Sequence, residues 1–411
     1  MKFSNYNFTQ ELLNGLESEG FTKPTDIQYK AIPSILKGED VMAIAATGTG
    51  KTAAYAIPII EKLVRHHEPY RGPRALVLAP TRELAVQIAG VFEKIGKQTD
   101  LLTVVLTGGV EQNSQVSQLN EQADIIVASP GRTFDLLAQK HFNLEAIKIF
   151  VLDESDRMMA LGFMKDVQDI KKRLPRNHQT LFFSATINET LKKQAYSVVK
   201  NAIRIQVSPK NQVSKNVDHK LLFIKMDDKR YFLERVIREN LEKKLIVFVR
   251  TQVRAERVSK AMKRVGLDVE TIHGGMEQQD RFAVIEKIKS DNQFVLITTD
   301  VSARGIDIKN VSFVINYDLP DEPENYIHRL GRTGRGVLKG YALSFCSDEE
   351  KNQLVEIEKY LDKAIEIQRI EKGDYDSVID FSEETKFNKK DIADLLKSEE
   401  SAKKKRKNRK K

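Results

Sequence analysis

The feature that most constrains the fold of this chain is the alternation of short apolar runs with longer amphipathic stretches. The runs are four or five residues long and almost continuously apolar, which is typical of strands buried on both faces of a parallel sheet. The stretches between them, such as Lys51–Arg65 and Arg82–Ile95, predict helices. Alternating strands and helices form right-handed crossover units, so we expect a doubly wound α/β architecture. The expected strands are residues 41–45, 75–79, 103–106, 124–127, 149–152 and 180–183 in the first half, and 245–249, 269–272, 294–297, 313–316 and 341–345 in the second.

The alternation occurs twice, and 411 residues are too many for one ordinary core. Residues 208–216, between the two halves, are polar and without periodicity, which indicates a linker. We therefore expect a first domain over residues 1–207, a second over 217–370 and a C-terminal extension over 371–411. Within that extension, residues 387–396 could form one short amphipathic helix.

The positive charge of the chain is concentrated at its end. The net charge is +9, and eight Lys or Arg without any acid lie between Lys403 and Lys411, so the rest of the chain carries only +1. A block of like charge stays disordered and suits a polyanion, although a merely solubilising tail is the alternative.

Cysteine content and hydropathy limit the class of protein. Cys346 is the only cysteine, which excludes an intramolecular disulfide and a cysteine-rich zinc cluster. No apolar run approaches the roughly 18 residues that a membrane span needs. We expect a cytoplasmic protein without membrane contacts.

A phosphate-binding loop is predicted between the first expected strand and the helix after it. Residues 45–52 read Ala-Ala-Thr-Gly-Thr-Gly-Lys-Thr, and the glycines let backbone N–H groups surround a phosphate at a helix N-terminus. Lys51 can neutralise the β- and γ-phosphates, and the Thr52 hydroxyl can ligate Mg²⁺. The predicted ATP-binding residues of this loop are Thr47, Gly48, Thr49, Gly50, Lys51 and Thr52.

Two carboxylates, Asp153 and Glu154, directly follow the expected strand 149–152. Ligands of open α/β sheets bind at the C-terminal ends of the strands. Asp153 is placed to hold Mg²⁺, and Glu154 is placed to orient and polarise an attacking water. Adjacent carboxylates without a cation would repel each other. Together with the phosphate loop, the pair predicts nucleotide hydrolysis.

Both halves together resemble the DEAD-box RNA helicases of superfamily 2, from about Phe3 to Ile370, which implies two tandem RecA-like domains. The segment Gly20-Phe-Thr-Lys-Pro-Thr-Asp-Ile-Gln28 is similar to the Q motif of the family, with Phe3 seventeen positions before Gly20. The resemblance implies that Phe21 stacks on adenine and that the Gln28 amide pairs with its Hoogsteen edge. An amide both donates and accepts, as adenine N6 and N7 require.

Other segments of the first half resemble motifs of the same family that contact RNA or couple the domains. Ser129 stands where the family usually has Thr, but it keeps a hydroxyl. The hydroxyls of Ser184 and Thr186 are implied to link the acidic motif to interdomain closure. The implied RNA contacts of this half are Pro80, Thr81, Arg82, Gly109, Ser129 and Arg132.

The second half matches further motifs of the family at residues 278–281, 299–307 and 328–335. Asp307 is similar to the residue that contacts the ATP ribose, and Thr299 and Arg304 to residues that contact RNA or the other domain. Arg332 and Arg335, with His328 beside them, are implied to be catalytic. Guanidinium groups keep their charge and can grip phosphate oxygens bidentately, so the two arginines could serve as arginine fingers after domain closure.

The acidic motif departs from the family name at one position, since Ser155 follows Glu154 where the name has Ala. Serine is only one hydroxyl larger than alanine, and the carboxylates are unchanged. We expect ATPase activity to survive, and we expect Ser155 to shift a hydrogen bond to Ser184 or Thr186.

The resemblance implies an ATP-dependent RNA helicase with ATP and Mg²⁺ as cofactors. It would couple RNA-stimulated ATP hydrolysis to local, non-processive duplex unwinding or to remodelling of RNA–protein complexes. RNA would be bound as a single strand or short duplex, independently of sequence. We expect a monomer, with ribosome-assembly or RNA-decay proteins as candidate partners. Two alternatives stay open: an ATP-gated RNA clamp or scaffold that unwinds little, and a DNA helicase of the same superfamily.

Overall fold

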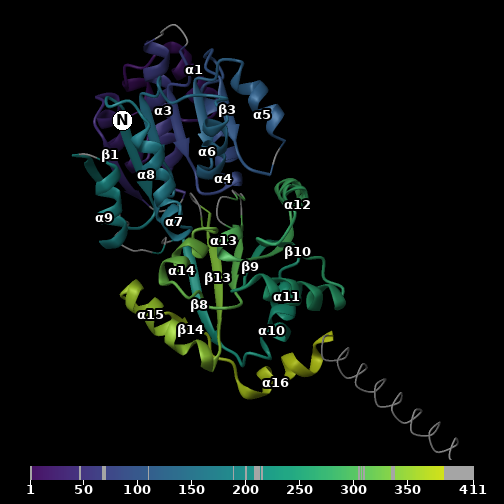
Figure 1. Ribbon diagram of the computed structural model, residues 1–411. Helices are drawn as coiled ribbons and strands as arrows, with labels where there is room; N and C mark the ends of the chain where they lie inside the picture. The colour runs from purple at the N-terminus through teal and green to yellow at the C-terminus, as the bar shows by residue number, and fades with distance from the viewer. Residues whose placement is uncertain are drawn as a thin grey trace, which may run out of the picture. The chain divides into compact units, whose positions relative to one another are not determined.

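The computed structural model of the chain divides near residue 211 into two compact units. Each unit contains one seven-stranded sheet with helices packed on it (Figure 1). Most of the expected linker, the expected helix over residues 387–396 and the basic tail lie outside the described residues. The structure describes residues 2–45, 48–66, 71–109, 111–187, 189–199, 201–207, 213, 216–303, 306, 308, 311–334 and 338–383.

The sheet of the first unit is entirely parallel, with the strand order β3-β4-β2-β5-β6-β1-β7. Its central strands β1, β2, β5 and β6 are buried along their whole length, as the continuous apolar runs predict. The strands are β1 (Val41–Ala45), β2 (Ala75–Leu78), β3 (Thr103–Leu106), β4 (Ile125–Ala128), β5 (Ile149–Leu152), β6 (Gln179–Ser184) and β7 (Ile203–Val207).

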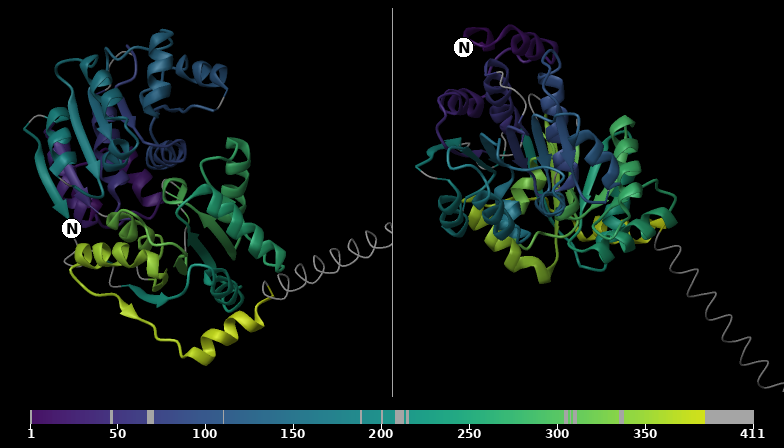
Figure 2. Two further views of the ribbon diagram at one scale, coloured as in Figure 1. Left: turned by 60° about the horizontal axis from the view of Figure 1, so that its bottom comes forward. Right: turned by 45° about the horizontal axis from the view of Figure 1, so that its top comes forward.

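Helices cover both faces of this sheet, so the first unit has three layers (Figures 1 and 2). Helices α1 to α4 pack on one face, and α5 to α9 pack on the other. Successive residues of each strand enter these two cores in turn, since Val41 and Ala43 contribute to one and Met42 and Ile44 to the other. The helices are η1 (Phe3–Asn5), α1 (Gln10–Ser18), α2 (Asp26–Leu36), α3 (Lys51–Arg65), α4 (Arg82–Ile95), α5 (Gln112–Leu119), α6 (Pro130–Ala138), α7 (Ser155–Ala160), α8 (Met164–Lys172) and α9 (Glu189–Val198).

The second unit repeats the topology of the first. Its parallel sheet has the order β10-β11-β9-β12-β13-β8-β14, which is the order of the first sheet when the strands are counted from β8. This repetition confirms the predicted tandem, doubly wound RecA-like architecture. The strands are β8 (Val217–Phe223), β9 (Lys244–Phe248), β10 (Glu270–Ile272), β11 (Phe294–Thr298), β12 (Phe313–Asn316), β13 (Gly340–Cys346) and β14 (Glu366–Ile367).

Helices α10, α11 and α16 cover one face of the second sheet. Among the described residues of both units, no helix is long and apolar enough to cross a membrane. The helices of the second unit are α10 (Lys229–Arg238), α11 (Gln252–Arg264), α12 (Gln278–Ser290), α13 (Asp300–Ala303), α14 (Pro323–Leu330), η2 (Asp348–Glu350), α15 (Lys351–Leu361) and α16 (Lys372–Phe381).

Every strand expected from an apolar run is present, with ends within one residue of the prediction. Three strands, β7, β8 and β14, were not expected. Strand β7 lies at an edge of its sheet, and four of its five residues are fully or partly exposed, so its sequence tolerates polar side chains. Strands of this kind lack the continuous apolar run on which the prediction rests.

Helix α16 lies beyond the segment in which the sequence pattern remains regular, and it packs against α10. The Tyr375 ring lies 4.8 Å from the Phe232 ring, and its hydroxyl donates to Asp228 Oδ2 at 2.8 Å. Val378 is buried in the same core. The C-terminal extension therefore begins with a helix that belongs to the second unit.

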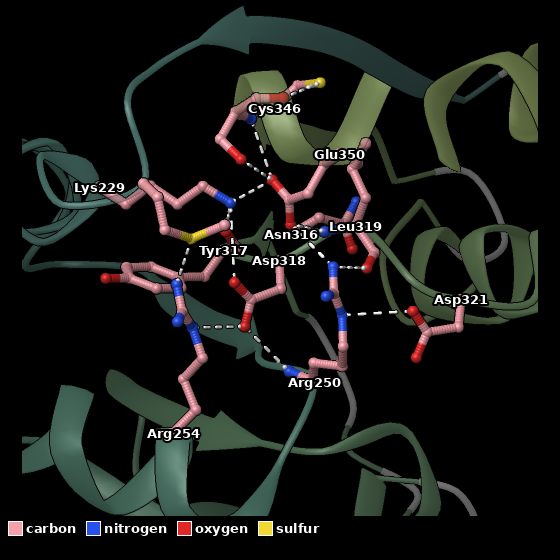
Figure 3. Close-up of polar contacts among 12 residues, drawn as sticks. Lys229, Arg250, Arg254, Asn316, Tyr317, Asp318, Leu319, Asp321, Cys346 and Glu350 are labelled. Atoms are coloured by element: carbon pink, nitrogen blue, oxygen red, sulfur yellow. Dashed lines mark hydrogen bonds and ion pairs between the residues drawn. The ribbon is translucent and has the colours of Figure 1, made fainter. Parts of the chain in front are cut away.

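A buried ionic network fixes the loop that follows β12 (Figure 3). The fully buried Lys229 at the start of α10 donates to the Tyr317 carbonyl at 2.7 Å and to Glu350 of η2. Glu350 Oε1 accepts from the Leu319 backbone N–H and from Arg250, both at 3.1 Å. These contacts join α10, η2 and the segment that leads into α14.

Replacement of Lys229 by Met should lower the free energy of unfolding of the second unit by about 3–5 kcal/mol, because the buried Glu350 carboxylate would lose the fully buried one of its two cations. Urea denaturation of the full chain measures this change. Lys172→Met is the control, since Lys172 pairs with Asp169 at an exposed site and should change stability by less than about 0.5 kcal/mol. Equal effects of the two substitutions would show that the network contributes little.

Candidate functional site

The predicted phosphate loop connects β1 to α3. Gly48 and Gly50 adopt positive φ angles of 78° and 89°, which side-chain-bearing residues rarely adopt. A Cβ atom on Gly50 would also lie 2.5 Å from Gln28 Nε2, so this position needs glycine for space as well as for conformation. Lys51 is the first residue of α3, and its ammonium group donates to the Ala45 carbonyl at 2.8 Å across the loop. Thr47 lies outside the described residues.

Asp153 lies at the end of β5 and is 2% exposed. Its Oδ2 accepts a hydrogen bond from the Tyr55 hydroxyl at 2.8 Å, and its Oδ1 accepts from the Glu154 backbone N–H at 2.8 Å. Burial raises the pKa of Asp153 to about 6, and the positive charge of Lys51 opposes this rise. A carboxylate that is buried in this way is stabilised in its ionised form by a nearby cation.

Glu154 has a left-handed backbone, with φ 48° and ψ 50°, at the N-cap of α7. Such a conformation costs roughly 1–3 kcal/mol for a residue with a side chain. Arg157 lies 3.7 Å from the Glu154 carboxylate. The strained turn directs the backbone away from β5 immediately after Asp153.

Hydrogen bonds join the acidic motif to the end of β6. Asp156 Oδ2 accepts from the backbone N–H and the hydroxyl of Thr186, at 3.2 and 3.0 Å. The Ser184 hydroxyl donates to the Thr186 carbonyl at 2.7 Å. The two predicted coupling residues therefore lie beside the acidic motif, and Asp156 is the carboxylate that contacts them.

The expected hydrogen bond from Ser155 to Ser184 or Thr186 is wrong. The Ser155 hydroxyl is fully buried and donates instead to the carbonyls of Leu152 and Phe183, at 3.3 and 3.1 Å. Backbone carbonyls at the ends of β5 and β6 lie closer to this hydroxyl than the side chains that follow them. Ser155 thus ties two neighbouring strands together.

The predicted adenine-binding residues lie in and before α2. Gln28 is 2% exposed; its Oε1 accepts from the Thr25 backbone N–H at 2.9 Å, and its Nε2 donates to the Gly50 carbonyl at 3.1 Å. This amide joins α2 to the phosphate loop. The Phe21 ring lies edge-on to Phe3, with 6.1 Å between ring centroids.

The predicted RNA-contacting residues of the first unit follow β2, β3 and β4, which are adjacent in the sheet. Pro80 and Thr81 follow β2, and the Thr81 hydroxyl caps α4 by accepting from Leu84 N–H at 3.4 Å. Gly109 follows β3 with φ 73°, and a Cβ there would lie 2.0 Å from the Arg82 guanidinium. The glycine thus permits close approach of the arginine.

Beyond β4, Ser129 is the N-cap of α6, and Arg132 lies in its first turn. The Arg132 guanidinium donates to the Thr107 carbonyl and to Gln112, both at 3.2 Å. Gln115 is buried and bonds both the N–H and the carbonyl of Thr107, at 3.1 and 2.9 Å. No motif or pattern in the sequence singles out Gln115.

In the second unit, the described site residues lie after β11 and at the end of α14. Thr299 directly follows β11 and is 7% exposed. His328 lies in the last turn of α14, and Arg332 follows that helix with 8% exposure. Three further predicted residues lie outside the described part of the chain: Arg304, Asp307 and Arg335.

The second unit also contains an ion pair between a buried arginine and a partly exposed aspartate, which the prediction missed. Arg329 is 1% exposed and binds Asp300 through two hydrogen bonds, at 2.6 and 2.7 Å. It also donates to Asn316, and its guanidinium lies over the Phe248 ring at 5.0 Å. The pair joins the segment after β11 to α14, so it fixes His328 and Thr299 relative to each other.

Comparison with known proteins identifies the family. The DEAD/DEAH box helicase family matches residues 25–194, and the helicase conserved C-terminal domain matches residues 228–337. The chain is 38% identical over 365 residues to the DEAD-box ATP-dependent RNA helicase RhpA of Helicobacter pylori strain B128, covering 89% of this chain and 73% of RhpA. It is 37% identical over 369 residues to the ATP-dependent RNA helicase DbpA of Bacillus subtilis, covering 90% of this chain and 76% of DbpA.

A solved structure agrees with these matches. Dbp5 of S. cerevisiae, bound to RNA and ADP BeF3, superimposes with a TM-score of 0.82 at 35% sequence identity. The superposition covers 92% of this chain and 97% of the Dbp5 chain. Both family regions match the chain, the relatives align with most of its length, and its sheet topology is repeated. The chain therefore belongs to the DEAD-box family of ATP-dependent RNA helicases.

Proposed function

We propose that this chain is an RNA-stimulated ATPase that uses ATP to separate short RNA duplexes locally, without processive tracking, or to remodel RNA–protein complexes. One observation carries the proposal. The phosphate loop and the acidic motif follow β1 and β5, and the RNA-type residues follow β2, β3 and β4, at the same edge of one sheet. The relatives are RNA helicases by name, and the Dbp5 structure contains RNA together with ADP BeF3.

ATP would be bound by its adenine, ribose and phosphates. Phe21 would stack on adenine, and Gln28 would exchange its present backbone partners for the adenine edge. The ribose would contact Asp307. The triphosphate would lie on the loop at the N-terminus of α3, where backbone N–H groups and the helix dipole favour an anion. Lys51 would turn from the Ala45 carbonyl to the phosphates.

The residues beside this loop fit a magnesium ion. Mg²⁺ prefers oxygen ligands and is commonly held by one or two carboxylates together with substrate phosphates. Thr52 offers a hydroxyl, and Asp153 offers a carboxylate whose burial makes a neighbouring cation favourable. When bound, the ion neutralises charge that develops on the phosphate oxygens. Glu154 would orient and polarise the attacking water.

RNA would be held by its backbone. Arg82 and Arg132 supply charge, and the hydroxyls of Thr81 and Ser129 and the Gly109 backbone can bond phosphate oxygens or 2′-hydroxyls. Phosphate contacts position a strand without reading its bases, so binding would be independent of sequence. Contacts to the 2′-hydroxyl give a physical basis for preferring RNA to DNA.

The second unit would complete the ATP site when the two units close on ATP and RNA. Arg332 and Arg335 would stabilise charge on the γ-phosphate, with His328 beside them, and Thr299 and Arg304 would contact RNA. Ser184 and Thr186, linked to the acidic motif through Asp156, would couple this closure to hydrolysis. Hydrolysis and phosphate release would reopen the units.

Several further features complete the proposal. The first unit would comprise residues 1–207, the linker 208–216, the second unit 217–370 and the extension 371–411. We propose a cytoplasmic location, because the single cysteine suits a reducing compartment. We also propose that the protein is a monomer. Its partners would be proteins of ribosome assembly or RNA decay. The basic tail would act as a loose electrostatic tether to RNA.

Glu154→Gln should reduce RNA-stimulated ATP hydrolysis by about 100-fold or more, because it removes the carboxylate that polarises water but keeps the side-chain shape. Phosphate release with single-stranded RNA, with DNA of equal length and with no nucleic acid measures this. Asp169→Asn, at an exposed position of α8, is the control and should behave as wild type. Wild-type stimulation by RNA alone is expected. Equal stimulation by DNA would favour the DNA-helicase alternative, and turnover indifferent to both would contradict the proposal.

Strand separation distinguishes a helicase from a clamp. Wild-type protein should release one strand of a short RNA duplex with ATP and bind single-stranded RNA stably with a non-hydrolysable ATP analogue. Stable binding with the analogue and no strand release with ATP would identify the clamp alternative.

Arg332→Lys should lower kcat for ATP by about 100-fold or more, because lysine keeps the charge but loses the bidentate fork, and arginine fingers are worth about 10³ to 10⁵ in rate. The KM for ATP should change little, since the contact is made mainly in the transition state. Steady-state kinetics at saturating RNA test this, with the exposed Arg264→Lys as control. A normal kcat would remove Arg332 from the catalytic site.

Ser155→Ala should change the RNA-stimulated rate by less than tenfold, which is about 1.4 kcal/mol of activation free energy. Both acceptors of the Ser155 hydroxyl are backbone carbonyls, and the carboxylates on either side stay in place. Steady-state ATPase assays at saturating RNA measure the rate. A larger change would mean that the link between β5 and β6 contributes directly to turnover.

A further inference from the structure

A tyrosine that the proposed mechanism does not use lies directly behind the proposed magnesium ligands. Tyr55 is on α3, one turn after Thr52, and is fully buried. Its hydroxyl donates to Asp153 Oδ2 at 2.8 Å. An ionised carboxylate only accepts hydrogen bonds, so the phenol is the donor in this contact.

Thr52 and Asp153 are the two residues that offer oxygen to magnesium in the proposed site. Thr52 and Tyr55 both lie on α3. The Tyr55 hydroxyl therefore connects the helix that carries Thr52 to the side chain of Asp153.

The hydrogen bond from Tyr55 limits how the Asp153 carboxylate can rotate. Oδ2 accepts from Tyr55 and Oδ1 accepts from the Glu154 backbone N–H, so one donor holds each oxygen. A carboxylate oxygen that accepts one hydrogen bond keeps a lone pair for a cation. Tyr55 and the Glu154 backbone thus fix the orientation of the carboxylate together.

Packing against aromatic residues of the hydrophobic core, and not a contact in the proposed ATP site, sets the position of the Tyr55 ring. The Tyr55 ring lies edge-on to Phe183, with 5.0 Å between centroids and 62° between planes, and it is tilted against Phe92 at 6.2 Å. A phenylalanine would satisfy these ring contacts equally well. The hydroxyl is therefore the part of the side chain that packing does not explain.

We propose that Tyr55 is a positioning residue for magnesium, because its hydroxyl holds the Asp153 carboxylate in the orientation that the ion requires. The inference rests on the proposed ATP site and deepens it. Groups that orient metal ligands commonly contribute about 10- to 100-fold to metal affinity.

The test is the magnesium dependence of nucleotide binding, which does not require turnover. Binding of a fluorescent ADP analogue to the full chain is followed by anisotropy while MgCl₂ is titrated, and again in EDTA. Tyr55→Phe should raise the magnesium concentration at half-maximal enhancement of binding about tenfold. Its affinity for the analogue in EDTA should equal that of wild type.

Two variants make the result specific. Tyr326→Phe removes another buried tyrosine hydroxyl, in the second unit, and should leave the magnesium midpoint unchanged. In an Asp153→Asn background, Tyr55→Phe should add less than twofold to the midpoint, because the substitutions then remove one shared interaction. Thermal unfolding of Tyr55→Phe should match that of wild type within the difference seen for Tyr326→Phe.

Failure of this inference can be told apart from failure of the proposed function. If wild type binds the analogue in a magnesium-dependent way and Tyr55→Phe shows the same midpoint, Tyr55 is a core residue only and the inference is overturned. A full tenfold change that persists in the Asp153→Asn background also overturns it, because the effect then does not act through Asp153. If wild type does not bind the analogue at any magnesium concentration, the proposed ATP site is wrong and the inference falls with it.

Discussion

The buried carboxylate of Asp153 is the constraint on which the rest of the site depends. A charge that is almost completely removed from water is costly unless it is paired and hydrogen-bonded. Burial raises the pKa of Asp153 to about 6, and the positive charge of Lys51 and the hydrogen bonds from Tyr55 and the Glu154 backbone oppose this rise. Lys51 and Tyr55 come from α3, and the backbone N–H comes from the turn after β5, so the local structure is organised around one unfavourable charge.

The repeated sheet topology explains how one architecture serves two ligands. In the first unit the nucleotide-type residues follow β1, β5 and β6, which are neighbours, and the RNA-type residues follow β2, β3 and β4, which are also neighbours. Loops at the C-terminal ends of parallel strands share one edge. In the second unit, Thr299 follows β11 at the corresponding edge, and Arg329 binds Asp300 there through two hydrogen bonds. Arg332 lies elsewhere, since the next residue, Thr333, pairs with Val311, which precedes β12.

Much of this could be predicted from the sequence. Central strands buried on both faces leave continuous apolar runs, and both helices that follow β1 and β2 begin and end where the periodicity predicts. The phosphate loop and the acids were found because short local patterns carry their chemistry. Strands β7, β8 and β14 were missed because partly exposed strands contain polar residues, and α16 was missed because its packing on α10 has no local signal.

The side-chain partners within the site were harder to predict. Tyr55 and Asp153 are 98 positions apart, and nothing in a segment rich in apolar residues distinguishes a tyrosine that serves a carboxylate from one that only fills the core. The expected partner of Ser155 was wrong for a similar reason, since a backbone carbonyl of β6 came closer than the side chains of the motif.

The left-handed backbone of Glu154 implies that protein stability and catalytic activity favour different residues at this position. Glycine or asparagine would adopt its φ of 48° and ψ of 50° with less strain than glutamate does, but neither has the carboxylate to which we assign the activation of water. Selection for thermal stability alone would therefore favour glycine or asparagine at this position and give inactive proteins. Selection for activity instead retains a glutamate that lowers the stability of the fold. A search for more robust forms of this enzyme is better directed at surfaces remote from the end of β5.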